Sequence, residues 1–481
     1  MTAIARPEPG SRDRDAVLIG GTWRPAGSQQ RIAVRDSATE QVIGTITSAG
    51  VQDVDHAVAA AAAALPGWAA TPPEARAERL DRLHAELSGR AEELTALISA
   101  EVGTAVRMSA AIQVASSLRL VELCAQLLGT EKLEEQLGNS LVIHRPVGVV
   151  AAITPWNYPL FQSVAKVAAA IAGGCTVVHK PSELAPLSSF VLAEATQAAL
   201  PDGVYNLVPG TGPEVGEAMA VHPGVAMVSF TGSTVAGTRV YELAARSIKR
   251  VALELGGKSA SVLLPDADFP AAVQATVNRA FLNSGQTCDA WTRLLVPRQQ
   301  LDDALDLAAA ATKRLTLGDP FEPRTKLGPL ISARQVTRVR GYVEQALSAG
   351  ASAMTGGPER PDGLERGHYF APTVLTGVNP GMQVAREEVF GPVLAVLTFD
   401  SEAEALEIAN DTEYGLSGAV WSADPDRATR FARNMQAGQV VINGGRFNPL
   451  APFGGVKQSG LGREQGIYGI REFLVPVALQ S

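Results

Sequence analysis

One cysteine of the chain, Cys288, lies in a stretch whose residue types suit a reactive thiol. The stretch Phe281-Leu-Asn-Ser-Gly-Gln-Thr-Cys288-Asp-Ala-Trp-Thr-Arg293 consists largely of small, polar, turn-compatible residues. The other two cysteines, Cys124 and Cys175, lie in apolar runs typical of buried side chains. The thiolate is the nucleophilic form of cysteine, and its surroundings decide how much of it forms. From these residues alone Cys288 is either a nucleophile or an ordinary thiol, because local signals for cysteine nucleophiles differ between families.

The composition is that of a globular protein with several domains. At 481 residues, the chain is long enough for about three domains or sub-domains. Its 41 basic and 49 acidic residues argue against a general nucleic-acid binder. The sequence has no run of 18 apolar residues, so no membrane span is expected, and residues 1–14 lack the apolar core of a signal peptide. Three scattered cysteines and six scattered histidines predict neither a disulfide scaffold nor a metal site, which favours a reducing, cytoplasmic setting.

Short apolar runs open the chain, and helices follow them. Residues 17–23 and 42–46 are predicted to be strands of a small antiparallel element. Apolar side chains at helical spacing predict helices between residues 53 and 109 and a further helix over about 110–128, and residues 131–145 turn to strand character near their end. Breaks in the helical region are expected at two dipeptides, Pro66-Gly67 and Pro72-Pro73.

Apolar strands alternate with helices from Val147 onward. The expected strands are 149–153, 176–179, 204–208, 226–230 and 251–255, and the expected helices are 162–172, 188–199, 214–220 and 236–247. Such alternation predicts repeated βαβ units and a parallel sheet. Strands that are apolar throughout are typical of a sheet buried on both faces.

Polar residues follow these strands at the edge of the sheet where ligands bind. They are residues 154–157, 180–183, 209–213, 231–234 and 254–258. In Phe230-Thr-Gly-Ser-Thr-Val-Ala-Gly237, glycine allows close approach of a ligand, and a helix N-terminus offers N–H groups to a pyrophosphate. Ser233 and Thr234 are equally suited to be plain helix caps. Glu183 suits the hydroxyls of an adenosine ribose, although with Lys180 it also fits the exposed start of a helix.

A second set of alternating segments predicts a second α/β domain. Strands are expected at 260–264, 292–297, 394–399 and 419–422, and helices at 270–284, 300–315 and 333–349. Residues 471–479 form a terminal apolar strand. An unpaired strand of this kind is an association hazard, so we expect it to pair with another subunit or with the strand near residue 140.

Five stretches together resemble one protein family, the NAD(P)-dependent aldehyde dehydrogenase superfamily. They are Pro155-Trp-Asn157-Tyr-Pro, Leu253-Glu254-Leu-Gly-Gly-Lys258, Asn283-Ser-Gly-Gln-Thr-Cys288, Glu387-Glu388-Val-Phe390-Gly-Pro392, and Pro452-Phe453-Gly-Gly-Val-Lys-Gln-Ser-Gly-Leu-Gly-Arg463-Glu464. The resemblance runs from about residue 16 to 478. It implies an α/β aldehyde dehydrogenase-like fold. The expected parts are a Rossmann-like cofactor domain (1–126 and 147–256), an α/β catalytic domain (257–457) and a small β oligomerisation extension (127–146 and 458–481).

The resemblance assigns catalytic roles to three residues. Cys288 matches the nucleophile, which attacks the aldehyde carbonyl and forms a thiohemiacetal. Asn157 matches the side chain that, with the Cys288 backbone N–H, donates to the developing oxyanion. Glu254 matches the general base that activates water to hydrolyse the thioester, a task that needs a raised pKa such as burial provides.

The resemblance also implies NAD as the cofactor. Lys180 and Glu183 match contacts to the adenosine ribose, and Glu183 favours NAD over NADP, although some relatives with this glutamate accept both. Further implied contacts to the cofactor are Ile153, Thr154, Pro155, Trp156, Ser182, Gly212, Gly216, Phe230, Thr231, Gly232, Ser233, Gly237, Leu255, Gly256, Glu388 and Phe390. Members of the family are typically dimers or tetramers, so a homodimer or homotetramer is expected.

The substrate tunnel implied by the resemblance contains one unusual residue, Asp289. Its other implied lining residues are Tyr158, Gln162, Ala165, Phe447 and Phe453. The small Ala165 predicts a wide tunnel for a medium or large apolar aldehyde. A carboxylate at Asp289, if it faces the tunnel, repels acidic aldehydes and raises the pKa of Cys288. Arg446, the one nearby cation, either binds an acidic substrate, which is the semialdehyde alternative, or simply faces solvent.

Two further alternatives concern the reaction itself. A CoA-acylating aldehyde dehydrogenase passes the thioester to CoA, and that group generally lacks the base that Glu254 matches. A non-catalytic, NAD-binding structural member usually lacks the nucleophile or the cofactor residues, and all of these are present in the sequence.

Overall fold

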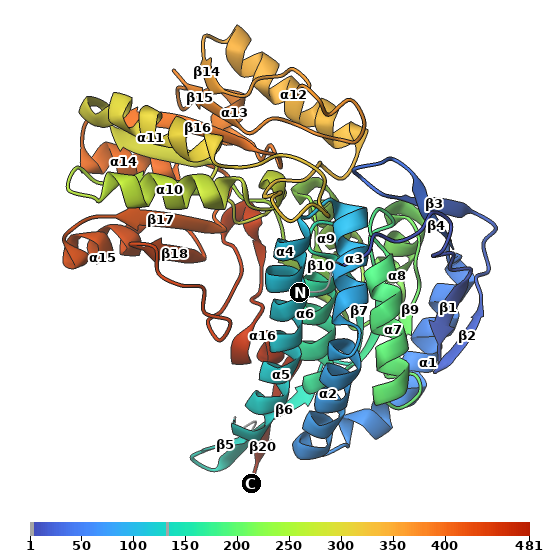
Figure 1. The fold of residues 1–481 in the computed structure, drawn as a ribbon. Coiled ribbons are helices and arrows are strands. Elements are labelled where there is room, and N and C mark those ends of the chain that lie inside the picture. Colours follow the sequence, from blue (N-terminus) through green and yellow to red (C-terminus); the bar gives the residue numbers. More distant parts are fainter. Residues whose placement is uncertain (1–3, 131–133) are drawn as a thin grey trace.

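The computed structural model describes residues 4–130 and 134–481. It contains two large sheets packed among helices and a thin arm that projects from the body (Figure 1). One large sheet has eight strands and the other seven. Apolar strands alternate with helices in both, so the predicted α/β fold class is confirmed.

Five parallel strands form the centre of the eight-stranded sheet. Side by side they are β11 (Arg250–Glu254), β10 (Met227–Thr231), β7 (Val149–Ile153), β8 (Thr176–Lys180) and β9 (Tyr205–Leu207). All five predicted strands are confirmed to within one residue at each end. β7 comes first in the chain yet lies between β10 and β8, so the strand order reverses beside it. A ligand cleft is expected outside the carboxyl ends of the strands at such a reversal.

The apolar character of β7 follows from burial on both faces. Val150 and Ala152 pack into one hydrophobic cluster, whereas Val149, Ala151 and Ile153 pack into another on the opposite side. Successive side chains of a strand point to opposite faces, so both faces of this sheet are covered and every position is apolar.

The covering helices come from two parts of the chain. From the N-terminal part come α1 (Val51–Ala69), α2 (Pro73–Ser88), α3 (Ala91–Val102), α4 (Val106–Met108), the π-helix η1 (Ser109–Val114) and α5 (Ala115–Thr130). From between the strands come α6 (Pro159–Ala172), α7 (Leu187–Ala199), the π-helix η2 (Gly212–Gly216), α8 (Glu217–Val221) and α9 (Thr234–Ala245). The break predicted at Pro72-Pro73 is confirmed, because α2 begins at Pro73. The break predicted at Pro66 is wrong: α1 continues through it to Ala69, since a proline removes only one backbone hydrogen bond so near the helix end.

The first predicted strand, residues 17–23, is in fact a hairpin. Gly20 and Gly21 have φ values of 59° and 77°, which glycine adopts without strain, and they turn the chain between β1 (Ala16–Ile19) and β2 (Thr22–Pro25). β1 pairs with β9, so the hairpin extends the large sheet. The strand predicted at 42–46 pairs elsewhere, because β3 (Arg31–Arg35) and β4 (Val42–Thr47) form a separate two-stranded sheet.

The seven-stranded sheet forms the second α/β unit, as predicted. Its strands, side by side, are β14 (Ser352–Thr355), β15 (Thr373–Thr376), β16 (Val393–Phe399), β13 (Arg293–Pro297), β12 (Ala260–Leu263), β17 (Ser417–Trp421) and β18 (Gln439–Ile442). Its helices are α10 (Phe269–Ala280), η4 (Arg298–Gln300), α11 (Leu301–Lys313), α12 (Ala333–Ser348), α13 (Gln383–Arg386), α14 (Glu402–Asn410) and α15 (Pro425–Asn434). The short 3-10 turn η3 (Leu282–Gly285) follows α10 and leads to Cys288.

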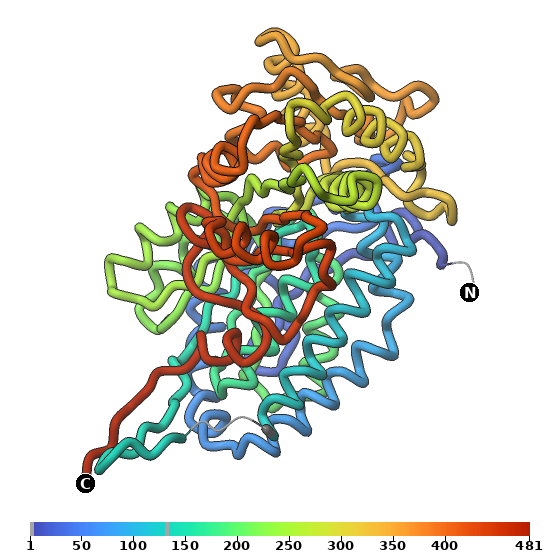
Figure 2. Tube along the Cα trace, turned by 90° about the vertical axis from the view of Figure 1, so that its left-hand side faces the viewer, coloured from blue at the N-terminus to red at the C-terminus, as the bar shows by residue number. Residues whose placement is uncertain are grey.

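The C-terminal segment joins three parts of the molecule. After the turn η5 (Lys457–Ser459), β19 (Gly460–Leu461) pairs with β11 and forms one edge of the first sheet. α16 (Gly466–Glu472) follows, and β20 (Leu474–Gln480) then pairs with β6 (Ser140–Pro146), which also pairs with β5 (Glu134–Leu137). These three strands form the projecting arm, with the C-terminus near its tip (Figure 2). The predicted pairing with the strand near residue 140 is confirmed. Residues 1–3 and 131–133 of the predicted tail and strand lie outside the described residues.

One helical stretch is long and apolar enough to cross a membrane by length and composition alone. It is Val106–Gly129, which comprises α4, η1 and most of α5. The stretch includes Arg107, Arg119 and Glu122, so it is not an uninterrupted run of 18 apolar residues of the kind that the sequence lacks. In the folded chain α5 packs against α2 and α6, as a core helix does.

Candidate active site

Two cavities meet at Cys288. One, of about 450 Å³, lies outside the carboxyl ends of β7 and β10 and is lined by Trp156, Gly232 and Glu388, among others. The other, of about 290 Å³, is lined mainly by apolar and aromatic side chains that include Tyr158 and Phe453. Cys288 and Asn157 border the first cavity, and Cys288 also borders the second. The thiol is therefore the point where a molecule in one cavity reaches a molecule in the other.

The loop before Cys288 is held in an unusual backbone conformation. Asn283, Ser284 and Gly285 have φ values of 53°, 55° and 74°, three consecutive left-handed residues. A Cβ atom on Gly285 would overlap the Gly391 carbonyl, so only glycine fits there. Non-glycine residues adopt this region at a cost of about 1–3 kcal/mol each, and they persist only where surrounding contacts impose it.

Buried amide side chains supply those contacts and hold Asn157 beside the loop. The Asn283 side-chain N–H group donates to the Asn157 carbonyl at 3.0 Å, and Asn157 Nδ2 donates to the Gln286 carbonyl at 3.0 Å. The Gln286 side chain accepts from the Ile331 N–H at 2.9 Å, and the Thr104 hydroxyl donates to Asn283 Oδ1 at 2.6 Å. These bonds place the Asn157 amide next to the turn that carries Cys288.

The environment of Cys288 opposes ionisation of its thiol in the protein alone. Burial raises its pKa well above the ordinary value, and the carboxylates of Asp289, Glu388 and Glu254 raise it further. The guanidinium of Arg279 acts in the opposite direction. Cys124 and Cys175 are also free thiols, and burial raises their pKa values to about 12 and about 11.

Glu254 lies at the end of β11 with a buried carboxylate. Neither of its oxygens has a hydrogen-bond partner among the described residues. Burial raises its pKa well above the usual value, and Glu464 raises it further, whereas Lys166 and Arg463 lower it. Lys166 and Glu464 form a buried ion pair. Glu464 lines the apolar cavity, whereas Glu254 is not among the described lining residues of either cavity.

Nine of the predicted cofactor contacts line the larger cavity. They are Pro155, Trp156, Thr231, Gly232, Ser233, Leu255, Gly256, Glu388 and Phe390. The rings of Trp156 and Phe390 meet edge to face at 5.4 Å, and the Gly257 N–H donates to Glu388 Oε1 at 3.1 Å. Burial raises the pKa of Glu388 to about 7. The Ser233 hydroxyl accepts from Ala236 N and caps α9, whose N-terminus therefore faces this cavity.

The other predicted cofactor contacts lie outside the described lining of that cavity. They are Ile153, Thr154, Lys180, Ser182, Glu183, Gly212, Gly216, Phe230 and Gly237. Gly216 faces the Lys180 side chain and Ile153, and Lys180 Nζ lies 3.6 Å from Glu183, so these residues form one group beside the cavity. The Thr154 hydroxyl instead meets the His179 ring at 3.0 Å in the core.

The glycines of the Thr231–Gly237 stretch have a packing role. A Cβ atom on Gly232 would lie 2.5 Å from the Phe230 ring, and one on Gly237 would overlap Leu255. Gly256 is similarly restricted, because its Cβ would lie 2.5 Å from Glu388. The local reason for these glycines is therefore contact with neighbouring side chains.

One wall of the larger cavity was not predicted from the sequence. Ile331, Ser332, Arg334, Gln335 and Arg338 line it from the start of α12, and Leu184 lines it from the loop after β8. Gln335 donates to the Phe390 carbonyl at 2.7 Å, and Arg338 donates to the Glu388 carbonyl at 2.6 Å. This helix start therefore holds the loop that carries Glu388 and Phe390. Ser332 is the N-cap of α12, so the start of this helix could be predicted from the sequence. Its position beside the larger cavity could not.

Five of the six predicted tunnel residues line the smaller cavity. They are Tyr158, Gln162, Asp289, Phe447 and Phe453. Ala165, which lies on α6, is not among the described lining residues and belongs to a hydrophobic core cluster, so the wide tunnel stays a prediction. Arg446 is likewise outside the described lining. Arg279, which the sequence analysis missed, lines the cavity and pairs with Asp289.

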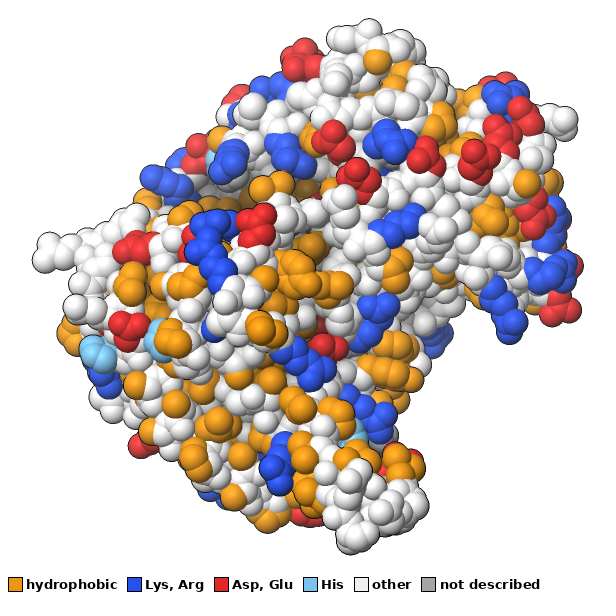
Figure 3. All heavy atoms as spheres, turned by 180° about the vertical axis from the view of Figure 1, so that it is seen from behind, with side chains coloured by type: hydrophobic (Ala, Val, Ile, Leu, Met, Phe, Trp, Pro, Cys, Tyr) orange, Lys and Arg blue, Asp and Glu red, His pale blue; other side chains and the backbone are white. Residues whose placement is uncertain are grey.

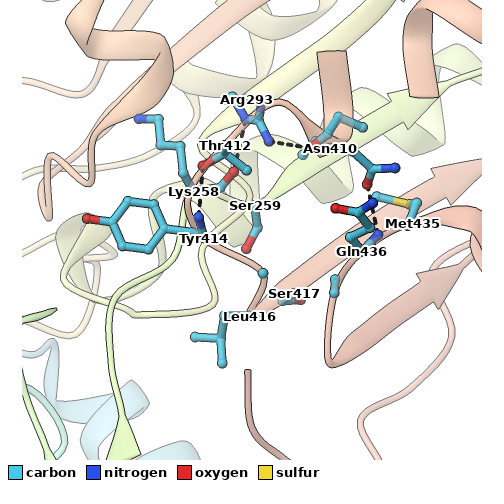
Figure 4. A pocket seen from close by; sticks show the side chains of 14 residues that line it. Lys258, Ser259, Arg293, Asn410, Thr412, Tyr414, Leu416, Ser417, Met435 and Gln436 are labelled. Carbon is cyan, nitrogen blue, oxygen red and sulfur yellow. Dashed lines mark hydrogen bonds between the residues drawn. The ribbon is translucent and has the colours of Figure 1, made fainter. Parts of the chain in front are cut away.

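A third, very small pocket adjoins the segment after Glu254. It has a volume of about 10 Å³ and is lined by Lys258, Arg293 and residues of three loops (Figure 4). Arg293 donates to the carbonyls of Lys258, Ile408 and Ala409, whereas the Lys258 side chain points away from it. Such a space holds at most one water molecule, so this cluster braces the segment after Glu254 and binds no substrate.

The sequence model of the aldehyde dehydrogenase family matches residues 23–478 of the chain. The chain belongs to this family. A 3-succinoylsemialdehyde-pyridine dehydrogenase from Pseudomonas sp. is 44% identical over 466 residues, which cover 96% of this chain and 98% of the relative. The family resemblance predicted from the five stretches is confirmed.

Solved structures of aldehyde dehydrogenases share the fold. A mutant of aldehyde dehydrogenase C from Pseudomonas syringae, in complex with NAD+ and octanal, has a TM-score of 0.97 and 45% identity, covering 99% of this chain and 98% of that one. An aldehyde dehydrogenase from Mycobacterium tuberculosis, in complex with NAD+, has a TM-score of 0.96 and 38% identity over 98% of this chain and 99% of that one.

Proposed function

We propose that the chain oxidises an uncharged aldehyde to the carboxylic acid with NAD, through a thioester on Cys288. The observation that carries the proposal is the position of Cys288 at the junction of two cavities, one at the strand reversal and one mainly apolar. The NAD+ complexes of aldehyde dehydrogenase C and of the Mycobacterium tuberculosis relative support the choice of cofactor.

The residues around the larger cavity fit a dinucleotide. The N-terminus of α9 directs free backbone N–H groups toward the cavity and suits a pyrophosphate. Glu388 and the aromatic pair of Trp156 and Phe390 suit a ribose and a flat ring. When bound, NAD accepts the hydride that leaves the aldehyde carbon.

The chain's own residues carry the covalent chemistry. The Cys288 thiolate attacks the aldehyde carbon, and the carbonyl oxygen becomes an oxyanion in the thiohemiacetal. Asn157 Nδ2 and the Cys288 backbone N–H serve as its donors. Asn157 is already fixed by its bond to the Gln286 carbonyl, so little reorganisation is needed. Loss of the hydride leaves a thioester on Cys288.

Hydrolysis of that thioester needs a base, and we assign this role to Glu254. Its buried, unpartnered carboxylate has a raised pKa, which makes it a stronger base than an ordinary carboxylate. Because Glu254 lies outside the described cavity lining, its side chain must turn toward Cys288 to activate water there. The nearby Lys166–Glu464 pair adjoins the apolar cavity and offers the proton a route away from Glu254.

The presence of Glu254 argues against the CoA-acylating alternative, since transfer of the acyl group to CoA needs no water-activating base. The non-catalytic alternative conflicts with the strained, closely packed loop that holds Cys288, because such conformations persist where function uses them. Formation of acyl-CoA would favour the CoA-acylating alternative. Binding of NAD without oxidation of any aldehyde would favour the non-catalytic alternative.

The charges around the apolar cavity favour uncharged substrates. Its two acidic lining residues, Asp289 and Glu464, are paired with Arg279 and Lys166. The described lining therefore offers an entering carboxylate no unpaired cation, and binding would remove that carboxylate from water. Octanal in the complex of aldehyde dehydrogenase C is consistent with an apolar substrate.

A matched pair of aldehydes tests this preference. We expect kcat/KM for octanal to exceed that for the same chain ending in a carboxylate by at least about tenfold, since desolvating an unpaired charge costs more than 1 kcal/mol. Both values are obtained from the initial rate of nicotinamide reduction. A higher kcat/KM for the acidic aldehyde would contradict the proposal and favour the semialdehyde alternative.

Cofactor choice is predicted to depend on Glu183. Its carboxylate is partly exposed beside Lys180 and would repel the 2′-phosphate of NADP. We expect NAD to be preferred, and Glu183→Gln to raise kcat/KM for NADP relative to NAD by roughly tenfold, as loss of one like-charge contact at a partly exposed site allows. Glu344→Gln, at an exposed position on α12, should leave the ratio unchanged. Equal use of both cofactors by the unmodified protein would contradict the preference.

We further propose a homodimer or homotetramer in a reducing, cytoplasmic setting. The three-stranded arm carries exposed Leu137, Val475 and Leu479, and Val235 and Ile248 are exposed on and after α9. Hydrophobic side chains also gather on the face seen in Figure 3. Apolar surface of this extent is typical of subunit contacts, and a reducing setting preserves a nucleophilic thiol. The domain division made from the sequence stays a prediction.

A further inference from the structure

Asp289 places a carboxylate directly beside the nucleophile. It follows Cys288 in the chain, is only 6% exposed, and lines the same cavity. A buried carboxylate here opposes formation of a neighbouring thiolate, because two like charges at low dielectric repel each other strongly. The chain must offset this repulsion if Cys288 is to act.

Arg279 is placed to offset it. The residue lies in the last turn of α10, nine residues before Cys288, and its guanidinium forms an ion pair with Asp289. Asp289 is the one residue that hydrogen-bonds to this side chain in the described structure, and Arg279 Nε is buried without a partner. The proximity of Asp289 raises the pKa of Arg279, so the guanidinium stays charged.

We propose that Arg279 is a positioning residue that neutralises Asp289 so that the Cys288 thiolate can form. The inference rests on the proposed role of Cys288 as nucleophile. Asp289 is buried and Arg279 is partly exposed, and an ion pair of this kind adds little to stability, so stability alone does not account for it. The two acidic residues that line the apolar cavity share this arrangement, since Glu464 pairs with Lys166.

The charged and titratable groups that act electrostatically on Cys288 come from several elements, and the experiment must separate their effects. They are Asp289 in its own loop, Arg279 on α10, Glu254 at the end of β11, Glu388 in the loop before β16 and Tyr158 before α6. Only the first two are changed below, so the contributions of the others stay constant.

The experiment measures alkylation of Cys288 by iodoacetamide as a function of pH, without NAD or aldehyde. Mass spectrometry of the peptide that contains Cys288 excludes signals from Cys124 and Cys175, and Cys288→Ala provides the blank. The variants are Arg279→Met, Arg279→Lys, Asp289→Asn and Arg279→Met with Asp289→Asn. Thiolate fraction, and hence alkylation rate below the pKa, falls tenfold for each unit of rise in the pKa.

Arg279→Met is expected to slow alkylation at about pH 8 by tenfold or more, as loss of a close opposite charge shifts a pKa by about one unit or more. Arg279→Lys should retain most of the rate, Asp289→Asn alone should increase it, and the double variant should return close to the unmodified rate. If Arg279 had only a structural role, its substitution would lower the melting temperature, and the alkylation rate of each variant would stay close to that of the unmodified protein.

An unchanged rate in Arg279→Met, or a double variant as slow as Arg279→Met, would overturn the proposal. If Arg279→Met does not fold, an unchanged rate in folded Asp289→Asn would overturn it equally. Because no aldehyde is used, failure of the proposed oxidation would appear as lost nicotinamide reduction in the unmodified protein and would leave these rates measurable.

Discussion

Cys288→Ala is expected to abolish nicotinamide reduction with every aldehyde, lowering kcat by on the order of 10⁴-fold or more. Removal of a nucleophile costs this much because the remaining site offers no other route to the covalent intermediate. Among the described lining residues of the two site cavities Cys288 is the one cysteine, whereas Cys175 is buried and Cys124 lies in α5. The measurement is the rate of NADH formation at saturating octanal.

A matched cysteine substitution makes this result specific. Cys124→Ala removes a thiol of similar burial from α5, away from both cavities, and should keep kcat within about twofold. Both variants should still be stabilised thermally by NAD, since binding to the folded state raises the melting temperature. Retention of a tenth or more of the activity in Cys288→Ala would exclude Cys288 as the nucleophile.

The strands of the sheet were predictable because burial leaves a strong pattern. Each residue of β7 is buried on one face or the other, so the sequence there is apolar throughout and is bounded by turns. Residues just after β7 and β10 line the larger cavity, because ligands bind outside the carboxyl ends of parallel strands. Trp156 and Gly232 lie where the strands end and the chain must turn.

The conformation of the nucleophile loop was not predictable from its residues. Asn283 and Ser284 are left-handed because contacts from distant parts of the chain impose it. The Ser284 hydroxyl donates to the Gly328 carbonyl at 2.7 Å, and the Gly391 carbonyl packs so closely against Gly285 that it leaves no space for a side chain. Neither contact leaves a mark in the local sequence, which reads as an ordinary turn.

Partners far apart in sequence account for the other omissions. Lys166 lies within an apolar helix, and its partner Glu464 is 298 residues away. Arg279 occupies the last turn of α10, where a cation already suits the helix dipole, so its pairing with Asp289 gave no separate signal. Ala165 was expected in the tunnel from the family resemblance, and in the structure it lies on α6 among the residues of a hydrophobic core cluster.

Glu254→Gln is expected to separate hydride transfer from hydrolysis. The glutamine cannot accept a proton, so the thioester on Cys288 should persist after NADH has formed. We expect a burst of about one NADH per active site, followed by turnover lowered by about 10²–10⁴-fold, the usual contribution of a general base. Rapid mixing measures the burst, and intact mass measures the acyl group on the protein.

The pH dependence gives a second test of the same assignment. Only the ionised carboxylate accepts a proton, so kcat of the unmodified protein should fall as pH falls through the pKa of Glu254. Burial and Glu464 hold that pKa well above the usual value, so the fall should begin well above pH 4.5. Glu254→Gln should lack this acidic limb, and Glu217→Gln, at an exposed pair with Arg239, should keep both the limb and full turnover. Absence of a burst together with unchanged turnover in Glu254→Gln would assign the base to another residue, and Glu464, which lines the cavity beside it, would be the next to test.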